Sequence, residues 1–192
     1  MRYSEKHKLQ THAKILREAS RLFREKGYNN VGIDAVMEKA GLTRGGFYGH
    51  FRSKRDLYNN VLKGNHEFVD RMRAREGASR QALSLQGKQI AKDYTSPEYR
   101  KQILKGCALA SLAMDTIRAS KTAKLAYAKT VRELADEFSR GIENAKPLDE
   151  RALQAIFTSV GALIIASASA SDGELADAIS LAAQKQLDHI LG

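Results

Sequence analysis

The sequence predicts an all-α protein, and three observations support that prediction. The chain of 192 residues contains only two prolines, so long helical stretches are tolerated. Apolar residues recur at helical spacing along most of its length. No long run of period-two alternation appears, which is the pattern that half-buried strands would leave.

The first predicted helix covers residues 9–26, and Gly27 is placed to end it. Its apolar face consists of Ile15, Ala19, Leu22 and Phe23. A second helix is predicted at 33–40, and Gly41 stops it. A third helix at 44–50 follows, with Thr43 as a plausible N-cap.

A longer fourth helix is predicted from Ser53 to about residue 73, because Ser53 and Asp56 have the spacing of a capping box. The remaining helices are predicted near residues 78–92, 97–118, 121–145, 149–170 and 173–191. Ser96-Pro97 makes a good helix start. Ser171 and Glu174 form another capping box signature at the start of the last helix.

Positive charge gathers in the first third of the chain. Residues 1–60 hold 13 Lys or Arg and 6 Asp or Glu, within a formal net charge of +10 for the whole chain. Nucleic acid is the first candidate partner, and an anionic membrane surface is the second. The alternative is that the basic surface is simply solvated and binds no partner. The single cysteine rules out an intramolecular disulfide, and the polar N-terminus has no apolar segment of the secretory type. Both features predict a cytoplasmic protein.

The uncharged stretch 152–171 is long enough to span a bilayer. Gln154, Thr158 and several serines dilute its apolar residues, however. A helix that is apolar nearly all round is more often buried in protein, so we expect a core or dimer-interface helix and no membrane partner.

The segment AGLTRGGFYGHF, residues 40–51, completes a predicted helix-turn-helix whose second helix enters the major groove of DNA. Arg44 stands at the N-terminal end of that helix and can pair with guanine or with a phosphate. Gly45 and Gly46 have no side chain that would hold the backbone away from the groove. Phe47 and Phe51 are expected to pack on the helix beneath. Four side chains are expected to meet phosphates, namely Thr43, Tyr48, His50 and Lys54.

The stretch from Leu9 to about Phe68 resembles the DNA-binding domain of the tetracycline-repressor (TetR) family of bacterial regulators. The matching residues are ILREASRLFREKGYNN and AGLTRGGFYGHFRSKRDL. The family's recurring tyrosine, histidine, phenylalanine and Ser-Lys pair correspond to Tyr48, His50, Phe51, Ser53 and Lys54. The chain departs from the family at Val31 and Gly32, where hydroxyl residues usually cap the second helix and touch phosphate. Asn30, which lies two positions before Gly32, could make this phosphate contact in place of the missing hydroxyl.

The resemblance implies a three-helix DNA-binding domain at 8–68 and a larger helical ligand-binding and dimerisation domain at 69–192, with about nine helices. It implies a homodimer on a palindromic double-stranded DNA operator, released by an unknown small-molecule effector, with no cofactor. The candidate effector-binding residues are His66, Phe68, Met72, Leu104, Cys107, Met114, Ile117, Tyr127 and Phe138. The expected dimer interface consists of Leu153, Phe157, Val160, Ile164, Leu175, Ile179, Leu187 and Ile190.

Four alternatives remain open at this stage. Lys105 and a helix N-terminus could lower the pKa of Cys107 and make the protein a redox or electrophile sensor, although most free cysteines are buried core residues. A nonspecific architectural protein would bind all duplexes alike. Activation is as compatible with these residues as repression. An enzyme is disfavoured, because the sequence has no HExxH motif, phosphate loop or metal-ligand spacing of its histidines, and we predict no catalytic and no metal-binding residues.

Overall fold

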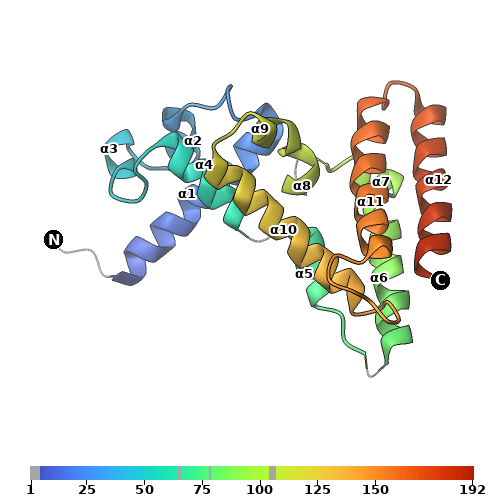
Figure 1. Cartoon of the computed structure of the whole chain (residues 1–192). Helices are drawn as coiled ribbons and strands as arrows, with labels where there is room; N and C mark the ends of the chain where they lie inside the picture. Colours follow the sequence, from blue (N-terminus) through green and yellow to red (C-terminus); the bar gives the residue numbers. More distant parts are fainter. Residues whose placement is uncertain (1–4, 65, 78, 104–106) are drawn as a thin grey trace. The chain divides into compact units, whose positions relative to one another are not determined.

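The computed structural model describes residues 5–64, 66–77, 79–103 and 107–192, and every regular element in these ranges is an α-helix (Figure 1). The prediction of an all-α protein is confirmed. The helices are α1 (Glu5–Lys26), α2 (Ile33–Lys39), α3 (Arg44–Phe47), α4 (Lys54–Lys63), α5 (Glu67–Arg73), α6 (Arg80–Tyr94), α7 (Pro97–Arg100), α8 (Ala108–Ser111), α9 (Ala113–Ile117), α10 (Lys121–Ser139), α11 (Glu150–Ala168) and α12 (Gly173–Leu191).

The chain forms two compact units, and the first is not continuous in sequence. The N-terminal unit comprises Met1–Gly64 together with Leu112–Tyr127, and the C-terminal unit comprises Asn65–Ser111 and Ala128–Gly192. The first division therefore falls after residue 64, whereas the resemblance implied a boundary at 68. The mid-chain segment that joins the N-terminal unit contains α9 and the beginning of α10.

In the N-terminal unit, α1 packs against α2 and α4, and α2 packs against α3. The predicted apolar face of α1 is buried in full. Gly27 and Gly41 adopt positive φ angles of 78° and 63°, a conformation that favours glycine, and so end α1 and α2 as predicted.

The segment 112–127 is attached to this unit by polar contacts. The carboxylate of Asp115 accepts the backbone N–H of Tyr28 at 2.8 Å. The hydroxyl of Tyr58, on α4, lies 3.0 Å from the hydroxyl of Thr116, which itself donates to the carbonyl of Leu112 at 2.8 Å. Tyr58 and Thr116 are both buried, and burial raises the pKa of Tyr58 to about 12.

Several predicted helices are shorter than expected. The single helix predicted from residue 53 to 73 is wrong: α4 ends at Lys63, Gly64 is extended with ψ of −175°, and α5 begins at Glu67. The start of α4 is as predicted, because the Ser53 hydroxyl accepts the Asp56 N–H at 3.1 Å. The single helix predicted at 97–118 is likewise wrong, since that range contains the short helices α7, α8 and α9.

Two predicted helix starts have different outcomes in the C-terminal unit. The Ser96 hydroxyl caps α7 by accepting the Tyr99 N–H at 3.1 Å, as Ser96-Pro97 predicted. The cap of α12 is Asp172 rather than Ser171, because the Asp172 carboxylate accepts the Leu175 N–H at 3.0 Å.

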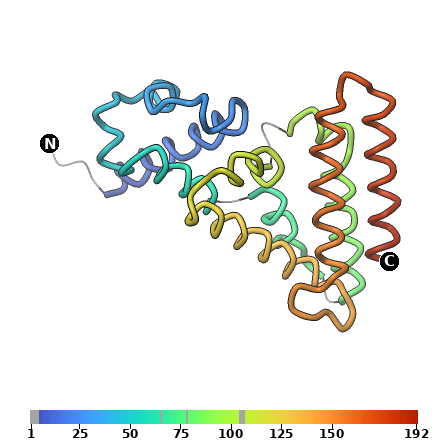
Figure 2. Tube along the Cα trace, turned by 45° about the horizontal axis from the view of Figure 1, so that its top comes forward, coloured from blue at the N-terminus to red at the C-terminus, as the bar shows by residue number. Residues whose placement is uncertain are grey.

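The core of the C-terminal unit is built on α6, α11 and α12, which pack against one another. Figure 2 shows α11 and α12 side by side as a long helical hairpin. Among the described residues, α11 is the one helix long and apolar enough to cross a membrane by length and composition alone. A core helix of a soluble protein meets the same criterion.

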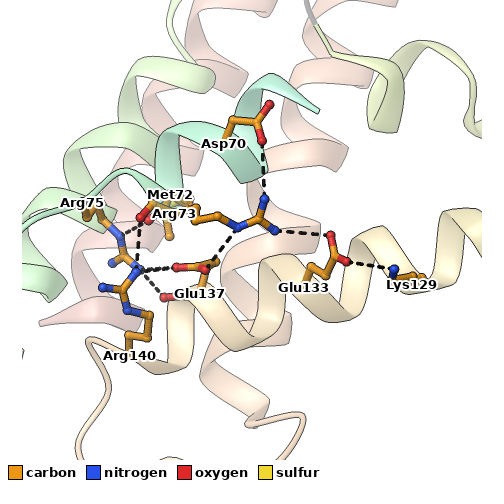
Figure 3. Close-up of polar contacts among 8 residues, drawn as sticks. All are labelled: Asp70, Met72, Arg73, Arg75, Lys129, Glu133, Glu137 and Arg140. Atoms are coloured by element: carbon orange, nitrogen blue, oxygen red, sulfur yellow. Dashed lines mark hydrogen bonds and ion pairs between the residues drawn. The ribbon is translucent and has the colours of Figure 1, made fainter. Parts of the chain in front are cut away.

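A buried arginine connects three segments of this unit (Figure 3). The guanidinium of Arg75 donates to the carbonyls of Met72 at 2.7 Å, of Leu83 at 2.6 Å, and of Glu137. A Cβ on Gly87 would lie 2.5 Å from this guanidinium, so the glycine provides the space for it. Burial lowers the pKa of Arg75, but three accepting carbonyls and the Glu137 carboxylate at 3.8 Å compensate its charge.

Candidate nucleic-acid interface

The predicted helix-turn-helix is present as α2, a turn, and α3, but α3 ends at Phe47 instead of residue 50. The chain continues from there in a turn, in which the Phe47 carbonyl accepts the N–H groups of His50 and Phe51. Thr43 stands at the N-cap position of α3 with extended backbone, as predicted, but its hydroxyl makes no capping hydrogen bond. Thr43 is exposed to solvent.

Arg44 is exposed at the start of α3 and is paired with a residue that the sequence analysis did not single out. Its guanidinium lies 2.6 Å from the carboxylate of Asp34 on α2, and both side chains are 64% exposed. An exposed pair of this kind contributes little to stability, so the guanidinium can exchange Asp34 for a guanine or a phosphate. The sequence feature that could have indicated this pairing is the acidic residue Asp34 in the first turn of α2.

The two glycines of α3 differ in their surroundings. A Cβ on Gly45 would meet no atom within 4 Å, whereas a Cβ on Gly46 would lie 3.7 Å from the terminal methyl of Met37. The backbone at Gly45 is thus the more open edge of α3. It stands next to Arg44, where a groove wall or a thymine methyl can approach.

The aromatic residues of this segment divide as the spacing predicted. Phe47 and Phe51 are buried, and Tyr48 is 59% exposed with its ring edge against Phe47. The burial of the two phenylalanines offsets the low helix propensity of the glycines beside them. The hydroxyl of Tyr48 is available to an external acceptor such as a phosphate.

His50 is half-buried and lies against α1. Its ring centroid is 6.0 Å from that of His12, and His12 stacks on Phe51 at 4.4 Å. Burial lowers the pKa of His50, with smaller contributions from His12 and Lys8. Its buried Nδ1 has no hydrogen-bond partner among the described residues.

Three other predicted contact residues already have partners or a backbone role. The ammonium of Lys54 lies 4.3 Å above the centre of the Tyr28 ring, and burial lowers the pKa of Lys54. The Asn30 amide donates to the carbonyl of Lys26 at 2.9 Å and so holds the end of α1. Gly32 provides the N-cap backbone of α2 without a side-chain hydrogen bond. Their phosphate contacts remain predictions.

The predicted effector residues are divided between the two units. Five of them lie in the C-terminal unit and are buried, namely His66, Phe68, Met72, Cys107 and Phe138. Met114, Ile117 and Tyr127 lie in the N-terminal unit, and Leu104 lies outside the described residues. Phe68 stacks on Tyr94 at 4.1 Å and meets Phe138 edge-on at 6.0 Å, which identifies an aromatic cluster in the C-terminal unit.

Cys107 does not have the environment of a reactive thiol. Its side chain is fully buried, and burial raises its pKa. Of the two alternatives given for Cys107, the structure contradicts a lowered pKa and agrees with a buried core residue, because desolvation of the thiolate dominates. Lys105, to which the lowering was attributed, lies outside the described residues.

The predicted dimer residues separate into an exposed and a buried set. Phe157, Ile164 and Leu175 are exposed, with Phe157 at 63%. Leu153, Val160 and Ile179 are half-buried. Leu187 and Ile190 are buried within a single copy of the chain, because they face the helices that pack on α12. These last two are core residues in this structure.

The N-terminal region is similar in sequence to known proteins. Residues 15–61 match the family model described as bacterial regulatory proteins, tetR family. The transposon Tn10 TetC protein of Escherichia coli is 38% identical over 60 residues, which cover 31% of this chain and 30% of that protein. The HTH-type transcriptional regulator TtgR of Pseudomonas putida is 35% identical over 63 residues, 33% of this chain and 30% of that protein. Each match thus spans less than a third of the relative.

Solved structures resemble the chain over nearly its whole length. The reduced form of E. coli NemR has a TM-score of 0.73 at 17% identity, covering 94% of this chain and 96% of that one. The SmeT–triclosan complex has a TM-score of 0.66 at 18% identity, covering 95% and 90%. At these identities the likeness shows the fold, including the helical region after residue 64.

Proposed function

Because the N-terminal domain of this chain belongs to the TetR family of bacterial regulatory proteins, we propose that the chain is a sequence-specific DNA-binding regulator of transcription in the cytoplasm. The observation that carries the proposal is the exposed edge formed by Arg44 and Gly45. There a side chain suited to guanine stands beside a backbone that no Cβ shields. The relative TtgR is itself a transcriptional regulator, which supports this role over an enzymatic one.

We infer that the protein acts as a homodimer. A two-fold dimer places two recognition segments about 34–36 Å apart, which fits a palindromic operator. The support is the exposed apolar surface of Phe157, Ile164 and Leu175 on the α11–α12 hairpin, which a second copy would cover. Replacing Phe157 with Glu is expected to give a monomer by sedimentation, whereas the same change at Leu85, an exposed leucine on α6, is expected to leave the dimer intact.

We further propose that a small-molecule effector in the C-terminal unit releases the DNA, so that the protein is a repressor. The support is the continuity of α10, which begins in the N-terminal unit and ends in the C-terminal unit. A shift of α10 would act on α9, which Asp115 and Thr116 attach to the DNA-binding helices. The effector need favour the released state by only a few kcal/mol.

The experiment is a selection of random duplex DNA by the purified protein at physiological salt. We expect a palindrome with half-sites about one helical turn apart. Arg44→Ala is expected to lose that preference, whereas Arg118→Ala, an exposed arginine at the end of α9, should retain it. Recovery of no enriched sequence, with binding that disappears as salt rises, would instead favour an architectural protein.

A further inference from the structure

A groove in the N-terminal unit collects ionisable side chains that the recognition of bases does not use. Its volume is 480 Å³, and Lys8 and His12 of α1 line it together with Gly49 and His50, which follow α3. A second groove of 500 Å³ shares Lys8, Gly49 and His50 with the first and extends to Thr43 and Gly46. The grooves therefore reach from the recognition segment to the N-terminal half of α1.

Several ionisable side chains among the described residues face His50. From α1 these are His7, Lys8 and His12, with Glu5 as the single acid lining either groove. On the side of α2 and the turn, Met37 and Leu42 are apolar and Thr43 is uncharged. An imidazolium at His50 thus has more positive than negative neighbours.

This arrangement opposes protonation in the free protein. The two imidazole rings are 6.0 Å apart with Lys8 beside them, so charge on one disfavours charge on the other. The Nδ1 of His50 is buried, and no acceptor for it lies among the described residues. A phosphate in the groove would supply the missing opposite charge.

We propose that this groove receives a DNA phosphate and that His50 takes up a proton when it does, so that DNA binding strengthens as the pH falls. The inference rests on the proposed DNA-binding function and adds a pH response to it.

The direction and size of the effect follow from linkage. Burial and like charge keep the pKa of His50 below its ordinary value in the free protein, and a bound phosphate raises it. Affinity is greatest below the free-state pKa, declines as the pH rises through the window between the two pKa values, and is constant above it. Uptake of this one proton changes Kd by up to about 10-fold per pH unit.

The test measures Kd of the full chain by fluorescence anisotropy between about pH 5.5 and 8 at constant ionic strength. The probes are a labelled duplex that carries the selected palindrome and a mixed-sequence duplex of equal length. The variants are His12→Gln and His50→Gln. His189→Gln is the matched control, because His189 is exposed on α12 in the other unit. Far-UV circular dichroism confirms that each variant is folded.

We expect the wild type and His189→Gln to bind more tightly at low pH, and each groove variant to have a shallower dependence on pH. Calorimetry of the wild type in two buffers of different ionisation enthalpy should show proton uptake on binding. A wild type that binds the palindrome equally well at every pH would overturn the inference and leave the proposed function intact. So would groove variants with the wild-type slope. Binding of neither duplex at any pH would refute the proposed function itself.

Discussion

The buried hydroxyl pair of Tyr58 and Thr116 gives a prediction in which two similar substitutions have unequal costs. The Thr116 hydroxyl donates to the Leu112 carbonyl at 2.8 Å and accepts from Tyr58 at 3.0 Å. Among the described residues, the one other acceptor for the Tyr58 hydroxyl is that same carbonyl, at 3.5 Å. Tyr58 therefore depends on Thr116, whereas Thr116 keeps a good hydrogen bond without Tyr58.

The magnitudes follow from that asymmetry. Tyr58→Phe removes one hydrogen bond and leaves the Thr116 hydroxyl satisfied, so it should cost about 0.5–1.5 kcal/mol of unfolding free energy. Thr116→Val preserves the shape but leaves a buried phenolic hydroxyl poorly paired, which should cost about 1–3 kcal/mol. The double variant removes both polar groups. Its cost should therefore be smaller than the sum of the two single costs, by about 1 kcal/mol.

The assay is urea unfolding followed by far-UV circular dichroism, with all four proteins at one concentration because a dimer's stability depends on it. Differences in the midpoint at constant slope give the changes in free energy. A cost for Tyr58→Phe that exceeds the cost for Thr116→Val would refute the reasoning, and so would strict additivity in the double variant.

Three further predictions concern single sites. Arg75→Met should lower the unfolding free energy by about 3 kcal/mol, because three carbonyls lose their hydrogen-bond donor. Arg80→Met, at an exposed arginine, should lower it by under about 0.5 kcal/mol, and thermal unfolding measures both changes. Cys107 should react with a thiol reagent far more slowly in the native protein than in urea, and fast native reaction would contradict its burial. Gly45→Ala should raise stability by up to about 1 kcal/mol and weaken DNA binding, and unchanged affinity would show that DNA does not approach there.

The sequence predicted most of the N-terminal unit because its signals are local. The apolar face of α1, the glycines that end α1 and α2, and the burial of Phe47 and Phe51 depend on spacing within one or two turns. The break at Gly64 was missed, because amphipathic spacing continues across it. A lone glycine inside a helical pattern does not decide between a helix and its end.

The site was predictable in its exposed residues and less so in their partners. Arg44 and Tyr48 are exposed as expected, but the pairing of Arg44 with Asp34 joins residues ten positions apart on two helices. The contact of His50 with His12 joins residues 38 positions apart, and the sign of the pKa shift at Cys107 depends on burial by the whole C-terminal unit. The spacing of residues along the sequence does not predict contacts, or burial, that depend on residues far apart in the chain.

The membership of residues 112–127 in the N-terminal unit changes what a regulatory motion would have to do. If the N-terminal unit ended at Gly64, the link to the C-terminal unit, in which we propose that an effector binds, would be the connection from α4 to α5 alone. The structure adds two further connections, since the chain enters the N-terminal unit between Ser111 and Leu112, and α10 leaves it and continues without interruption into the C-terminal unit. Three connections constrain the recognition segment more than one does. A displacement of α10 would then reach α1 and α4 through Asp115 and Thr116, without contact between the effector and α3. Variants of Thr116 should accordingly alter effector response as well as stability.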